Sequence, residues 1–170
     1  MKAEELYQLY YSYTYCSYKT SMLLKSLGFD DICSNTYGIG IFYHDEYIGF
    51  DEECELIDAG KKDEIQYIPG GWIYNYMQSR NSDSLVNEDD CTMPSYEQAL
   101  EYMRVAHDIH IFIIRKNGRW HWCMQDMRGN DEFSVSNAGY TDYGTALDTG
   151  IAEIAKNIKE KKNENGNISK

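Results

Sequence analysis

The stretch PSYEQALEYMRVAHDIHIFIIRKNGRWHWCMQD, residues 94–126, holds a helix start, a helix and a β-hairpin in succession. Ser95, with Gln98 three residues later, forms a capping box, in which each side chain can satisfy a free backbone N–H group of the first helical turn. The run 109–115 is β-branched and favours a strand. Asn117-Gly118 tolerates the positive φ angles of a type I′ turn, so we predict a returning strand over 119–126.

A two-residue turn also fixes which residues of the two strands face each other. Ile113 should lie opposite Trp122, and Ile111 opposite Met124. Alternate residues share one face of a strand, so we expect one face to pack against helices with the side chains of Ile111, Ile113, Trp120, Trp122 and Met124. The other face is of mixed polarity, either half covered or available to a partner, and carries His110, Phe112, Ile114, His121, Cys123 and Gln125.

Two further helix starts have the same local pattern of a cap followed by a tyrosine and an apolar stripe. These caps are Ser17 and Asp142, and Gly28 stands where a left-handed C-cap of the first of these helices belongs. A third strand is expected over 133–137. The sequence therefore predicts an α+β fold with an antiparallel sheet, in which a three-stranded meander over about 109–137 is packed by helices starting near Ser17, Ser95 and Asp142.

The chain is long enough for one hydrophobic core, with 170 residues of which 42% are hydrophobic. We expect residues 1–160 to form a single globular α+β domain with an acidic insertion over about 37–90, and residues 161–170 to form a flexible tail. Inside the insertion, strands are expected over 39–43 and 47–50. Gly40 is expected to mark a bulge or a close backbone approach, and Pro69-Gly70-Gly71 to form a turn.

The charge is strongly acidic and concentrated. The chain has 28 acidic and 16 basic residues, a formal net charge of −12, and nine of the carboxylates fall between Asp45 and Glu64. Such a surface repels nucleic-acid phosphates and anionic membranes and attracts basic proteins. The expected partner is therefore a basic or nucleic-acid-binding protein rather than nucleic acid or a membrane, and the oligomeric state stays open.

Motifs for a cofactor, metal or targeting signal are weak. The first five residues, MKAEE, do not continue into an apolar signal region, and no apolar run reaches the length of a membrane span, which favours a cytoplasmic protein. His110, His121 and Cys123 share the mixed hairpin face, but they are more typical of half-buried polar residues than of a zinc site. Neither a phosphate-binding loop nor a nucleophile motif is present, so no cofactor is predicted and an enzyme is the less favoured class.

Several segments together carry a resemblance to a known group. LKSLGFDDIC (24–33), PSYEQALEYMR (94–104), the aromatic strand and residues 143–147 look like small uncharacterised proteins encoded by phages and mobile elements of gut Bacteroides. The resemblance covers most of the chain from Ser17 to Ile158. That group has no known activity, so the resemblance implies a setting, that of a mobile-element accessory protein.

The function expected from these patterns is non-enzymatic protein binding, including an acidic inhibitor or nucleic-acid mimic acting on a host or defence protein. Carboxylates steer toward basic surfaces, and Tyr and Trp give contact area with few rotors to freeze. The candidate binding residues are Asp45, Glu46, Asp51, Glu52, Glu53, Trp72, Tyr74 and Tyr76. Three alternatives stay open: DNA binding through the three-stranded sheet, a small enzyme whose site the fold assembles, and acidity that serves solubility while the tyrosines fill a core.

Overall fold

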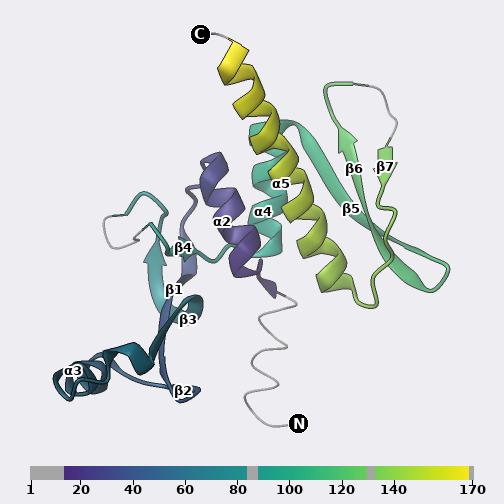
Figure 1. Ribbon diagram of the computed structural model, residues 1–170. Helices are drawn as coiled ribbons and strands as arrows, with labels where there is room; N and C mark the ends of the chain where they lie inside the picture. The colour runs from purple at the N-terminus through teal and green to yellow at the C-terminus, as the bar shows by residue number, and fades with distance from the viewer. Residues whose placement is uncertain (1–13, 84–87, 130–132, 169–170) are drawn as a thin grey trace. The chain divides into compact units, whose positions relative to one another are not determined.

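The computed structural model describes residues 14–83, 88–129 and 133–168 (Figure 1). The chain divides into two compact units. Unit 1 comprises Met1–Asp31 and Met93–Lys170, and unit 2 comprises Ile32–Thr92 between them. Helices and antiparallel sheets confirm the predicted α+β class. That residues 1–160 act as a single domain stays a prediction.

Unit 1 contains the predicted meander. Its elements are α2 (Tyr18–Leu27), α4 (Tyr96–His107), β5 (Ile109–Lys116), β6 (Arg119–Asp126), β7 (Phe133–Val135) and α5 (Tyr143–Ile168). The sheet has the order β5-β6-β7, with both neighbouring pairs antiparallel. Helix α4 contacts β5, helix α5 contacts β5 and β6, and α2 packs on α5 (Figure 1). Helices α4 and α5 therefore cover the sheet, and α2 packs on α5.

The three predicted helix starts are confirmed, each by its own hydrogen bonds. Ser95 Oγ accepts from the Gln98 amide at 3.2 Å, and Gln98 Oε1 accepts from the Ser95 amide at 3.0 Å. Ser17 caps α2, which ends at Gly28 with a φ of 100°. Asp142 Oδ1 accepts from the Thr145 amide at 2.7 Å. Because these bonds satisfy orphan donors within a few residues, local sequence is sufficient to set them.

The hairpin register is also confirmed, with Ile113 opposite Trp122 and Ile111 opposite Met124. The turn between the strands has positive φ at both residues, 51° at Asn117 and 77° at Gly118. A Cβ built on Gly150 of α5 would lie 2.7 Å from Trp122 Cβ, so the indole packs directly against this helix. The predicted core face is the face that the helices cover.

On the opposite face of the sheet, side chains of the two outer strands lie beside the residue at the centre. Cys123 in the central strand is fully buried, and burial raises the pKa of its thiol. Phe112 of β5 and Phe133 of β7 lie to either side, with ring centroids 5.5 Å apart. Phe133 itself is 52% exposed. The mixed face is thus buried at its centre and open at its rim.

Unit 2 is built on one long antiparallel ladder. Its elements are β1 (Cys33–Tyr43), β2 (Glu46–Tyr47), α3 (Phe50–Asp58), a 3-10 turn (Lys62–Glu64), β3 (Ile65–Ser79) and β4 (Cys91–Thr92). The sheet order is β2-β1-β3, and β4 also pairs with β1. The predicted return strand over 47–50 is too long, because the strand ends at Tyr47 and Phe50 already begins a helix.

The turn predicted at Pro69-Gly70-Gly71 is wrong, because β3 continues through it. Gly38 lies opposite Trp72 and Gly40 opposite Ile68, so three residues of β3 stand against one residue of β1. Gly70 has a φ of 70°. A Cβ on Gly40 would lie 2.8 Å from the backbone carbonyl carbon of Gly71, which confirms the close approach expected at Gly40.

Helix α5 continues to Ile168 and so includes most of the residues predicted to form a flexible tail. The flexibility of 161–170 stays a prediction. Within the described parts of the chain, the helices fall short of the length and apolar character that membrane crossing requires.

Candidate functional site

The most acidic part of the chain folds as α3. Its first turn contains Asp51, Glu52 and Glu53, whose negative charge suits the positive end of the helix dipole. Glu52 Oε2 accepts a hydrogen bond from the Gly49 backbone N–H at 3.0 Å, which is the half of a capping box that a glycine N-cap can still form. At the other end Gly60 has a φ of 78°. These signals start and stop a nine-residue helix locally.

No residue of α3 is buried. Phe50, Cys54 and Ile57 recur at the spacing of a single helix face. Phe50 is 73% exposed, Ile57 is 38% exposed, and the Cys54 thiol is exposed between them. The carboxylates of Asp51, Glu55 and Asp58 border this stripe and are exposed as well. Helix α3 therefore presents an apolar stripe edged with negative charge.

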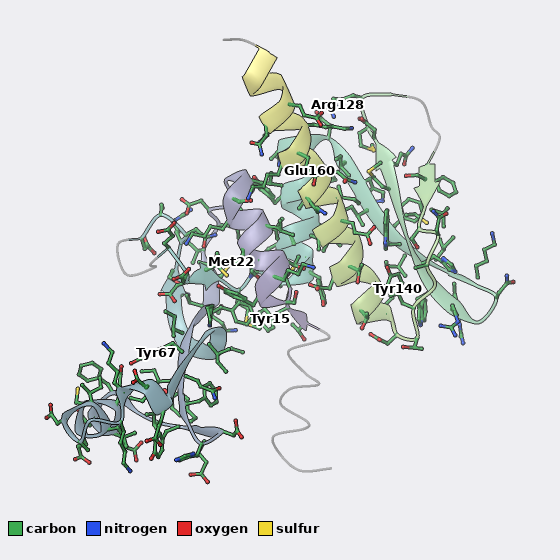
Figure 2. The ribbon with its side chains drawn as sticks, in the orientation of Figure 1. Tyr15, Met22, Tyr67, Arg128, Tyr140 and Glu160 are labelled. Carbon is green, nitrogen blue, oxygen red and sulfur yellow. The ribbon has the colours of Figure 1, made fainter. Side chains whose placement is uncertain are left out.

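The other side of α3 is tied to the start of β3. The hydroxyl of Tyr67, which is labelled in Figure 2, donates to Glu53 Oε1 at 2.5 Å. This bond raises the pKa of the Tyr67 phenol. Lys61 Nζ donates to the Tyr43 hydroxyl at 3.1 Å and lies 5.5 Å from the centroid of that ring. The hydrogen bond from Lys61 to Tyr43 also raises the lysine's pKa. These contacts link Glu53 of α3 to the start of β3, and Lys61, which follows the helix, to the end of β1.

Asp45 lies in the turn between β1 and β2, and Glu46 is the first residue of β2, at the same end of the ladder as α3 (Figure 1). His44 Nε2 in this turn lies 3.3 Å from Glu64 Oε2, next to the start of β3. We call this surface the acidic end; it consists of Asp45, Glu46, Tyr47, Phe50, Asp51, Glu52, Glu53, Glu55, Ile57, Asp58 and Tyr67. All of these side chains except Glu53 are exposed.

The five predicted acidic site residues are thus gathered at one end of unit 2. The three predicted aromatic residues are not at this end in the backbone ladder, since Trp72 pairs with Gly38 and Tyr74 with Thr36, far from the turn at Asp45. The side chains of Trp72, Tyr74 and Tyr76 lie outside the part of the chain that the structure describes. The ladder therefore separates the two halves of the predicted site along the strand direction.

Sequence reasoning missed the aromatic residues that the acidic end does expose. They are Tyr47 and Tyr67, each 45% exposed, and Phe50. The spacing of Phe50, Cys54 and Ile57 was the available signal, because residues four and three apart share a helix face.

Clefts lie on either side of α4 among the described residues of unit 1. One, of about 440 Å³, lies between α4 and β5 and is lined by Asp31, Glu97, Gln98, Leu100, Glu101, Arg104, His110 and Ile111. The other, of about 460 Å³, lies between α4, β6 and α5 and contains His107 and Arg128. Among residues 14–83, 88–129 and 133–168, no three His, Cys, Asp or Glu side chains gather as a metal ion requires. His121 instead lies with Nδ1 3.2 Å from the Ser136 carbonyl oxygen.

Comparison with protein-family models, with curated proteins and with solved structures finds no match for this chain.

Proposed function

We propose that the chain is a protein-binding module whose acidic end binds a basic protein. The observation that supports this most is α3, a nine-residue helix with no buried residue and an exposed stripe of Phe50, Cys54 and Ile57. Isolated helices of fewer than about 12 residues are marginal in water, and most helices gain their stability by packing an apolar face. A partner that covers the stripe supplies that packing.

The charge around the stripe defines the partner's chemistry. Asp51, Glu55 and Asp58 border it, and Asp45 and Glu46 lie at the neighbouring turn. The matching surface has an apolar centre surrounded by Lys and Arg. Apolar anchors supply affinity, while the carboxylates mainly speed association and select against acidic proteins. More specifically, we propose that the chain is an acidic inhibitor, a nucleic-acid mimic that occupies the nucleic-acid site of a host or defence protein. This role suits the mobile-element setting that the sequence resemblance implies.

The test is affinity capture from bacterial lysate with the tagged full chain. We expect basic proteins to be retained at low salt and released as salt screens the charges. Retention should be lost with Phe50→Ala/Ile57→Ala and reduced with Asp51→Asn/Glu55→Gln/Asp58→Asn. The matched control is Val105→Ala on α4, which truncates an equally exposed apolar side chain (66% exposed) outside the acidic end. Equal retention by the control and the Phe50/Ile57 variant would contradict the proposal.

If the chain acts as a nucleic-acid mimic, the captured partner should also bind DNA. A DNA duplex should compete with the chain for that partner, because both would occupy the same basic surface. The chain itself should not retard DNA in a gel at low salt. Retention of DNA by the chain alone would overturn the mimic form and favour DNA binding through the sheet of unit 1.

A further inference from the structure

Within the described part of unit 1, β5 is an edge strand of the sheet. Among the described residues its eight-residue length pairs only with β6, in continuous register and without a bulge. Exposed edge strands are usually protected by proline, bulges or charges, because their free N–H and C=O groups invite pairing with another strand. β5 has no proline, and its lysine and arginine are confined to the last two positions, Arg115 and Lys116. This edge is suited to strand addition.

The cleft between α4 and β5 lies beside this edge and is acidic. It contains the carboxylates of Asp31, Glu97 and Glu101 above the apolar side chains of Leu100 and Ile111. Arg104, its one arginine, bonds Glu101 at 2.5 and 3.0 Å and offsets one of those charges. A guanidinium with an apolar stem fits such a lining, since arginine buries its methylenes and directs its charge to carboxylates.

β5 itself carries an arginine, Arg115, next to its last residue. In antiparallel pairing of β5 with a second copy about a two-fold axis, directly opposite residues share one face of the sheet. Alternation then allows a centre on a residue but not between two residues, and the residues at the middle of β5 are Phe112 and Ile113. These two registers place Arg115 of one copy opposite Ile109 or Ile111 of the other, on the face that α4 covers. Either register puts the guanidinium next to the acidic cleft.

We propose that two copies of the chain pair through β5, forming one continuous sheet in which Arg115 of each copy enters the acidic cleft of the other. The interface is self-complementary, as two-fold symmetry requires, and it closes both long edges at once. The outer edge left on each side is β7, which has only three residues. In the single chain Arg115 lies exposed, 5.5 Å from the centroid of the Trp120 ring. Such an exposed cation–π contact is weak and can be exchanged for the carboxylates.

This inference concerns unit 1 and does not depend on the acidic end. The test is sedimentation velocity of the full chain over a wide concentration range, with no partner present. We expect a monomer–dimer equilibrium. Arg115→Glu and Glu97→Lys should each weaken the dimer about tenfold or more, because each places like charges together. The double variant Arg115→Glu/Glu97→Lys should restore dimerisation.

Matched controls are Arg119→Glu on β6 and Glu153→Lys on α5, which change the same charges at exposed positions away from the edge. Both should dimerise as the native chain does. Hydrogen exchange at the β5 amides should be slower at concentrations at which the dimer forms than after dilution to the monomer. A monomer at every concentration, or a dimer that Arg115→Glu leaves unchanged, would overturn the proposal. If the monomer instead bound an added extended peptide at β5, the occupant would be a partner rather than a second copy.

Discussion

His107 is the last residue of α4 and an unusual one. Its ring stands edge-on to Tyr102, with centroids 5.3 Å apart, and its Nε2 is buried without a hydrogen-bond partner among the described residues. Burial lowers the pKa of His107 below its ordinary value of 6.5. The positive charges of Lys162 and Arg128 lower it further, and Asp108 partly opposes them. The neutral imidazole is therefore the form that the fold favours.

This lowered pKa predicts a pH-dependent stability. The unfolded chain takes up a proton at His107 near pH 6.5, where the folded chain resists it, so stability is complete above that pH and falls as the pH falls. We expect His107→Phe, which keeps an aromatic ring beside Tyr102, to reduce the loss of unfolding free energy between about pH 7.5 and about pH 5. Urea denaturation at each pH measures it. Identical pH slopes for the two proteins would refute this role.

At the scale of elements, local chemistry decided what could be predicted. Ser95 with Gln98 and Asn117 with Gly118 specify a helix start and a turn within four residues, and both were predictable. Helix α3 was not, because its N-cap is a glycine and its apolar stripe faces solvent. The bulge at Pro69 was also missed. Proline and glycine locally favour a turn, and β3 continues through them because it pairs with β1 on both sides of the bulge.

The candidate site shows the same limit. The acidic residues could be predicted as a surface from charge alone, since carboxylates stay exposed unless they are paired. Grouping them with Trp72 and Tyr74 required the register of a strand that starts 20 residues after Asp45, and sequence does not supply this register. The burial of Cys123 has a similar cause, because Phe133 flanks it from a separate strand.

A carboxylate on one helix completes the cap of another. Asp148 of α5 accepts from the Ser17 amide at 2.8 Å and from the Ser17 hydroxyl at 2.7 Å, at the start of α2. We expect Asp148→Ala to lower the free energy of unfolding by about 1–3 kcal/mol, because it removes charge-assisted bonds to a helix N-terminus. Chemical denaturation measures the change. Glu153→Ala, an exposed change on the same helix, should stay within about 0.5 kcal/mol; equal effects would contradict the coupling.

At the scale of the molecule, unit 1 has a core that unit 2 does not supply. Leu24 and Phe29 precede unit 2, Met103 and Ile151 follow it, and all four are buried. We expect a chain in which a short Gly-Ser linker replaces residues 32–92 to unfold cooperatively. The comparison protein is the full chain with Trp72→Phe, so that Trp120 and Trp122 report in both. A broad, non-cooperative transition in near-UV circular dichroism would show instead that unit 1 requires unit 2.

The bond between Ser17 and Asp148 spans 131 residues and has a consequence for synthesis. As the chain leaves the ribosome, all of unit 2 emerges before Met93, so its ladder can close early. Helix α2 must then wait for α5, on the order of several seconds at typical elongation rates. During that interval its apolar side chains, including Leu24, lack α5, the helix with which α2 makes its main contacts. In that interval the nascent chain is most exposed to chaperone binding and to aggregation. This exposure ends when α5 has been synthesised and packs on α2.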